Sequence, residues 1–184
     1  MMRHVIRFIT IFLISLSAQA TEKSASDTGR DFYNLLKQEN YSAAATYYSP
    51  GALQEFRQLM SFENELTGAQ KQLFFQEYFE PDLNDESVEK LSDTDFLTAF
   101  LHGVISSETF SQMINYKNVD ILGEIKEQKD LAHVLTRQWI SLGGHKMEII
   151  EVTSFDKVGS EWKVGMTGKL KGVVLMIRQQ FLQQ

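Results

Sequence analysis

The sequence predicts an α+β fold in which N-terminal helices pack on a four-stranded antiparallel meander sheet, with a further helix after the last strand. Apolar residues recur at helical spacing over residues 25–116 and then alternate with polar residues up to residue 167. The loops between the alternating segments are of hairpin length, so neighbouring strands are expected to be antiparallel. Residues 168–184 return to helical spacing.

Residues 24–41 predict a first helix that starts with an acidic turn and stops near Asn40. Its apolar stripe consists of Phe32, Leu35 and Leu36. Residues 41–50 predict a short second helix. We expect Pro50 to end it, because the residue before a proline is disfavoured in the α conformation.

Residues 51–62 predict a third helix, whose apolar stripe is formed by Leu53, Phe56 and Met60. Thr67 and Gln70 follow with the spacing of a capping box, in which each side chain bonds the backbone N–H of the other residue. This pattern predicts the start of a fourth helix that carries the aromatic run at residues 73–79.

Residues 80–87 are rich in acidic and turn-forming residues and form the main break in the helical half. Ser92 with Asp95 is an acidic variant of the capping box and predicts a helix over residues 96–106. The face of this helix that is expected to be buried consists of Phe96, Phe100 and Val104.

Four segments with a period of two are predicted as strands: residues 118–127, 131–141, 145–155 and 161–167. The double glycine at residues 143–144 predicts a two-residue turn between the second and third strands. In the resulting register, Trp139 lies opposite Glu148 and Leu135 opposite Val152. Three-residue loops are expected on both sides of this hairpin.

With these registers, nine apolar side chains share one face of the sheet, and we expect the helices to cover it. They are Val119, Ile121, Ile125, Leu135, Trp139, Ile150, Val152, Val164 and Met166. Burial of each large side chain stabilises the fold by roughly 1.5–3 kcal/mol. The other face mixes polar and apolar residues and is expected to contact solvent or a second copy of the chain. It carries Leu122, Val134, Thr136, Gln138, Ile140, Met147, Ile149, Glu151 and Thr153.

The final helix carries an apolar stripe that is either core or an interface to an envelope partner, with core favoured. This stripe consists of Leu170, Val174, Ile177 and Phe181.

Arg137 and Glu148 lie diagonally on the predicted apolar face, and two interpretations follow. The first is an ion pair that joins the two strands. The second is the polar patch of a pocket between sheet and helices, where a few polar groups among apolar walls are typical of a ligand site. The predicted ligand-binding residues are Arg137, Trp139, Glu148, Leu135, Tyr48 and Phe100.

Candidate catalytic bases are few. His133, His102 and Asp95 could act as a general base if they faced a pocket. However, a lone histidine on an apolar face is more often a hydrogen-bonded structural residue, and Asp95 is explained by its capping position. The sequence has no cysteine, no paired-histidine metal motif, no G-x-S-x-G and no phosphate-binding glycine loop. A non-catalytic module without metal or cofactor is therefore favoured over an enzyme.

Ala132, Val134 and Arg137 in the second strand, together with "EWKV" at residues 161–164, resemble the NTF2-like superfamily (the cystatin-like α+β cone). The similarity is greatest to its small secreted, lumazine-binding-like members. The resemblance implies a curved antiparallel sheet that wraps helices around a pocket, often in a homodimer. Some members are cofactor-independent isomerases or dehydratases with a His or Asp base. The chain departs from this pattern in its long helical half and its final helix.

Residues 1–20 have the three parts of a secretory signal peptide: Arg3 and Arg7, an apolar run, and a small-residue cleavage site that ends at Ala20. Cleavage there would leave one domain over residues 21–184, without a membrane span or lipid anchor. A cysteine-free exported protein of this size is typical of the bacterial periplasm.

The chain has 24 acidic against 18 basic residues and no basic cluster, which disfavours nucleic acid as a partner. Expected partners are a small apolar or amphipathic ligand, an envelope protein or a second copy of the chain.

Overall fold

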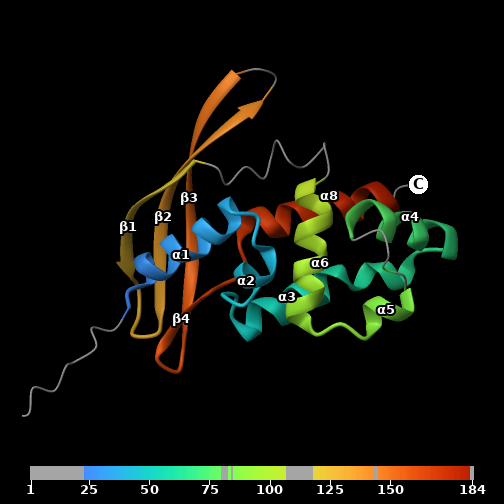
Figure 1. Ribbon diagram of the computed structural model, residues 1–184, viewed down its shortest axis with the longest axis horizontal. Helices are drawn as coiled ribbons and strands as arrows, with labels where there is room; N and C mark the ends of the chain where they lie inside the picture. Colours follow the sequence, from blue (N-terminus) through green and yellow to red (C-terminus); the bar gives the residue numbers. More distant parts are fainter. Residues whose placement is uncertain (1–22, 80–82, 84, 107–117, 143–144, 183–184) are drawn as a thin grey trace, which may run out of the picture.

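The computed structural model of this chain has an α+β fold (Figure 1). Seven helical segments precede a four-stranded antiparallel sheet among the described residues, and one helix follows it. The strand order is β1-β2-β3-β4, which confirms the predicted meander. The structure describes residues 23–79, 83, 85–106, 118–142 and 145–182.

The helices of the first half are α1 (Ala25–Lys37), α2 (Tyr41–Ala45), α3 (Pro50–Met60), the 3-10 helix η1 (Ser61–Glu65), α4 (Gly68–Tyr78), α5 (Asp85–Glu89) and α6 (Asp93–Ser106). Both hydrogen bonds of the predicted capping box between Thr67 and Gln70 are present at the start of α4. The short α5 lies within the segment predicted as a break. Pro50 begins α3 rather than ending α2, because its fixed φ and missing N–H suit the first turn of a helix.

The strands are β1 (Val119–Lys126), β2 (Leu131–Leu142), β3 (His145–Val158) and β4 (Glu161–Val164), and the last helix is α8 (Gly168–Leu182). The register of β2 against β3 is the predicted one, with Trp139 opposite Glu148 and Leu135 opposite Val152. The double glycine itself lies outside the described residues. β2 and β3 extend beyond β1 and β4 as a two-stranded ribbon (Figure 1).

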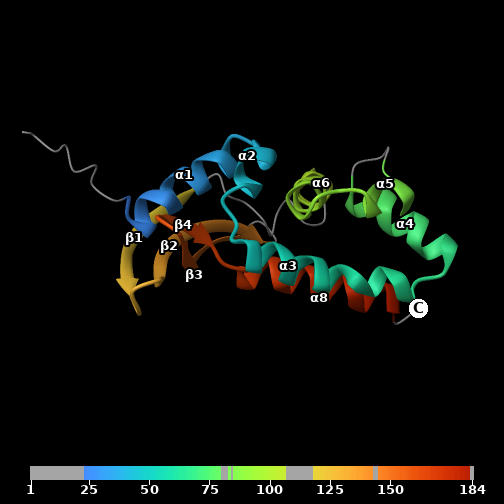
Figure 2. The same ribbon diagram turned by 90° about the horizontal axis from the view of Figure 1, so that it is seen from below.

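The prediction of which sheet face is buried is wrong for most of the nine apolar residues. Ile125, Val152 and Ile150 are 58%, 56% and 51% exposed, and Leu135 and Trp139 share their side of the sheet. The buried face of β2 consists instead of Ala132, Val134, Thr136 and Gln138, each with 0% exposure. We call this buried side, which α1 covers, the inner face, and the opposite side the outer face (Figure 2).

Two irregularities in the sheet divide the nine apolar residues between its inner and outer faces. A bulge in β1 between Ile121 and Gly123 turns Val119 and Ile121 to the inner face, while Ile125 stays on the outer face. The turn between β3 and β4 spans two residues rather than three, because Gly159 adopts a positive φ of 65°. Val164 therefore lies opposite Phe155 and is buried on the inner face.

The inner face is covered because α1 approaches it closely. A Cβ atom added at Gly29 of α1 would lie 3.4 Å from Cζ of Phe155 and 3.5 Å from Cγ1 of Val134. Ala132 and Thr136 are also small enough to let the helix lie near the strands, whereas the larger Leu135 and Trp139 stand on the other side. Side-chain volume, not only polarity, thus favours this face for the helix.

The remaining helices pack beside the sheet, and α3 and α8 run side by side (Figure 2). All four residues of the predicted apolar stripe of α8 are buried, which confirms the core interpretation: Leu170, Val174, Ile177 and Phe181. The predicted stripe of α6 is equally buried, and its Phe100 ring lies 5.1 Å from the ring of Phe56 between centroids. This helical core is separate from the outer face.

Candidate functional site

The outer face brings together four of the six predicted ligand-binding residues. Arg137 and Glu148 form the expected diagonal ion pair, with 2.9 Å between Nε and Oε1, and both side chains are partly exposed. Leu135 and Trp139 lie on the same side of β2 and are half-buried. Together with the exposed residues of the neighbouring strands, they lie on a partly exposed surface of the sheet.

The other two predicted ligand-binding residues lie elsewhere. Tyr48 is buried beside β4, where it forms an isolated bridge with Val164. Phe100 is fully buried in the helical core, and its ring lies 5.7 Å from that of Phe79. The six residues therefore do not line one cavity.

The three candidate bases do not converge either. His133 lies on the outer face, where Nδ1 is 3.1 Å from Oγ of Ser154 and Nε2 is 2.5 Å from Oε2 of Glu127. His102 is exposed on α6, and its ring meets the Tyr41 ring edge to face.

Asp95 is at the start of α6, where its carboxylate accepts from the Ser92 hydroxyl across 2.6 Å and its backbone N–H donates to the same Oγ. It therefore has the capping role that the sequence suggested.

The inner face carries a buried polar network that no sequence pattern predicted. The amide of Gln138 donates to Glu151 across 2.5 Å, and Nζ of Lys169 on α8 lies 3.3 Å from the same carboxylate oxygen. Nearby, the Tyr33 hydroxyl of α1 lies 2.8 Å from Oγ1 of Thr153. These bonds compensate the cost of burying polar groups and join α1 and α8 to the sheet.

Burial raises the pKa of the Tyr33 hydroxyl well above its ordinary value, and the nearby Glu151 carboxylate raises this pKa further. Burial also raises the pKa of Tyr48, and the neighbouring Tyr33 and Glu151 act in the same direction. The cause is common to both groups, because a phenolate would be poorly solvated inside the protein.

Stability is therefore expected to fall in alkaline solution. A tyrosine whose pKa is higher in the folded than in the unfolded state stabilises the fold fully below the ordinary pKa of about 10, and loses this contribution as pH rises toward the raised value. Each such group lowers the free energy of unfolding by up to about 1.4 kcal/mol per pH unit. Urea unfolding at a series of pH values from about 8 to 11 measures how steeply the free energy of unfolding falls with pH. Tyr33→Phe should make this pH dependence less steep. An unchanged slope would contradict the conclusion that Tyr33 contributes to it.

Among the described residues, no group of three His, Cys, Asp or Glu side chains is arranged to bind a metal ion. Within the same residues, no helix combines the length and apolar character needed to cross a bilayer. No protein-family model, curated protein or solved structure matches the chain. Fold and surface thus define an α+β protein with a helix-covered inner face and an outer face on which the apolar side chains of Ile125, Ile150 and Val152 are exposed.

Proposed function

We propose that this protein is a non-catalytic interaction module that docks onto another protein through the outer face. The observation that carries the proposal is the exposure of Ile125 on β1 and of Ile150 and Val152 on β3, on the same side of the sheet. Exposed apolar side chains of this size on one face are typical of interaction sites, because covering them removes apolar surface from water.

The charges of the outer face favour a largely neutral partner surface. Arg137 is balanced by Glu148 at the centre of the face, and Glu127 lies against His133 near its edge. Apolar side chains interspersed with paired charges are compatible with a protein interface. A second copy of the chain meets this requirement, since it presents the same apolar side chains and the same balanced charges across a twofold axis.

We further propose that the protein acts after export, as an NTF2-like module of the periplasm. Support for export comes from the signal-peptide pattern of residues 1–20 and the lack of cysteine. Support for the family comes from the order of helices and meander strands, together with the "EWKV" strand, now β4. Secretion of the processed chain, with Thr21 as its first residue, would be measured by N-terminal sequencing of the periplasmic fraction.

Val152→Glu is expected to weaken docking at least tenfold while leaving the fold intact, because the carboxylate would be desolvated in the complex but exposed in the free protein. Sedimentation velocity over a concentration series measures self-association. A photo-crosslinking phenylalanine analogue at position 150 captures a different partner in the cells that produce the protein.

Leu175→Glu on α8 is the matched control, since Leu175 is also an exposed aliphatic residue but lies away from the sheet. The proposal requires a crosslinked species that Val152→Glu abolishes and Leu175→Glu preserves. A chain that stays monomeric at every concentration and crosslinks to nothing from position 150 would refute it.

A further inference from the structure

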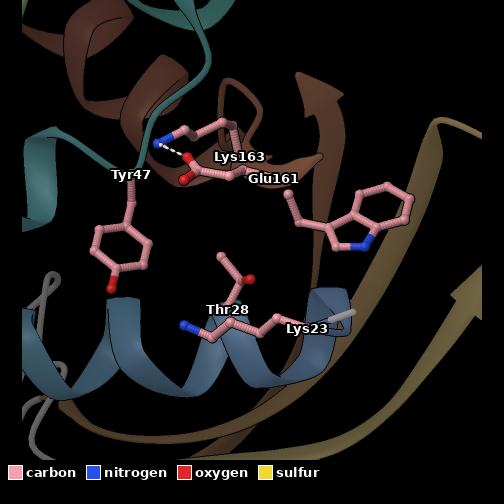
Figure 3. Close-up of a pocket in the computed structure, with 6 residues that line it drawn as sticks. Lys23, Thr28, Tyr47, Glu161 and Lys163 are labelled. Carbon is pink, nitrogen blue, oxygen red and sulfur yellow. Dashed lines mark ion pairs between the residues drawn. The ribbon is translucent and has the colours of Figure 1, made fainter. Parts of the chain in front are cut away.

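The charged side chains that line a pocket of about 250 Å³ between the start of α1 and β4 are engaged in ion pairs (Figure 3). Nζ of Lys163 lies 3.0 Å from Oε2 of Glu161, and Lys23 pairs with Asp31. This pocket therefore does not select the charge of an occupant. The outer face, in contrast, carries a serine, a histidine and a carboxylate in a cluster that docking does not use.

Ser154, His133 and Glu127 form a continuous hydrogen-bonded chain. Ser154 lies directly opposite His133 on the neighbouring strand, and its Oγ is 3.1 Å from Nδ1 of the ring. The other ring nitrogen, Nε2, is 2.5 Å from Oε2 of Glu127, which follows β1. A nucleophile, a base and a group that orients the base are thus within hydrogen-bond reach of one another, as an activated nucleophile requires.

The carboxylate fixes the direction of these hydrogen bonds. An ionised carboxylate can only accept, so Nε2 of neutral His133 carries the proton and donates to Glu127. Nδ1 then presents its lone pair and accepts from the Ser154 hydroxyl. In this tautomer the histidine can remove the serine proton, and Glu127 stabilises the imidazolium that forms.

The cluster is accessible and lies beside apolar side chains. Ser154 and His133 are half-buried, and Glu127 is exposed. The exposed Ile125 lies directly opposite His133 on β1. Val152, which is also exposed, precedes Ser154 by two residues on the same side of β3. A hydrocarbon chain attached to Ser154 would lie against these two side chains, which favours an aliphatic group.

We propose that Ser154 is a modification site that accepts a short aliphatic acyl group from an aryl ester or a thioester. His133 is the general base, and Glu127 positions its ring. Oγ of Ser154 attacks the carbonyl carbon of the donor while the hydroxyl proton moves to Nδ1 of His133. The bond between this carbon and the phenolate or thiolate breaks, and the leaving group takes the proton from the imidazolium. One ester bond forms as one donor bond breaks, without oxidation or reduction.

The acyl group remains on the chain because the product is an alkyl ester. A phenolate or thiolate leaves more readily than the Ser154 alkoxide, so acylation is faster than hydrolysis of the product. Each chain therefore takes up one acyl group, which is a modification and not turnover. The reaction needs no docking partner, so either proposal can fail without the other.

The probe that tests this proposal is p-nitrophenyl butyrate. The unmodified chain is expected to release about one equivalent of p-nitrophenolate, as acylation of a single nucleophile requires. Peptide mapping by mass spectrometry should place the butyryl group on Ser154. Ser154→Ala should abolish the release. His133→Gln should slow it about a hundredfold or more, because general base catalysis contributes about 10²–10⁴-fold.

Glu127→Gln should slow acylation about tenfold, since it replaces a hydrogen bond to a charged group by a neutral one. Glu127→Asp keeps the charge and should recover most of the rate, which a purely structural role would not predict. Val152→Ser tests the acyl chain. It should slow the reaction of the butyrate about threefold, through lost apolar contact, and leave that of p-nitrophenyl acetate unchanged.

His102→Gln on α6 and Ser160→Ala in the turn between β3 and β4 are the matched controls, and both should react as the parent does. Circular dichroism verifies that each variant keeps the fold. The proposal is overturned if butyryl groups are found only on lysines, if His133→Gln reacts as fast as the parent, or if release continues well beyond one equivalent.

Discussion

Gly103→Ala is expected to destabilise the protein by about 2–3 kcal/mol, although alanine is the better helix former. A Cβ atom at Gly103 would lie 2.4 Å from both the carbonyl carbon and oxygen of Tyr78, and 2.6 Å from the nitrogen of Phe79. These are backbone atoms at the end of α4, so the contact is relieved only by moving one helix against the other. Overpacking of this kind costs about 1–3 kcal/mol, occasionally more. Urea unfolding measures the difference in the free energy of unfolding between Gly103→Ala and the parent protein.

Gly172→Ala provides the matched control. Gly172 lies in the interior of α8, and its added Cβ would have no neighbour within 4 Å. The substitution should therefore stabilise the fold by about 0.5–1 kcal/mol, the ordinary helical preference for alanine over glycine. The same chemical change is thus expected to have opposite signs on two helices. Equal effects at Gly103 and Gly172 would show that α4 and α6 do not pack as closely as described.

Phe100→Ala is expected to lower the free energy of unfolding by about 3–5 kcal/mol. Phe100 is fully buried, and its ring contacts those of Phe56 and Phe79. Truncation removes these contacts and leaves a cavity. The experiment also separates two roles of this residue, because the apolar pattern predicted Phe100 in a ligand pocket, whereas the structure places it in the helical core.

Leu73→Ala is the control for this second experiment, since Leu73 lies on the exposed side of α4. Leu73→Ala should change the free energy of unfolding by no more than about 0.5 kcal/mol. If Phe100→Ala lowered the free energy of unfolding by less than about 1 kcal/mol, the Phe100 ring would border empty space. That result would restore the prediction of a pocket at this position.

The helical half was predictable because each helix carries its own signals. The Thr67 and Gln70 side chains form the capping box that their spacing suggested, and Phe96 and Phe100 lie on the buried side of α6. Both features depend on residues three or four positions apart, which a helix brings together whatever surrounds it. The short α5 was missed, because one turn of helix has too few residues to show a period.

The candidate site was predictable only in part. The Gly-Gly turn placed Arg137 diagonally opposite Glu148, and the ion pair is present. In contrast, Tyr48 and Phe100 were added to the site only because they are large and apolar, a property that core residues share. The buried contact between Tyr33 and Thr153 on the inner face joins residues 120 positions apart, and no local pattern marks such a pair.

The sequence alone determined the order of helices and strands and the pairing of β2 with β3, because both follow from local periodicity and from one two-residue turn. Only the tertiary structure decided which face of the sheet is buried. Alternation divides side chains between two faces but does not say which one a helix will cover. That choice depended on the bulge after Ile121, the left-handed Gly159 and the close approach of α1 at Gly29.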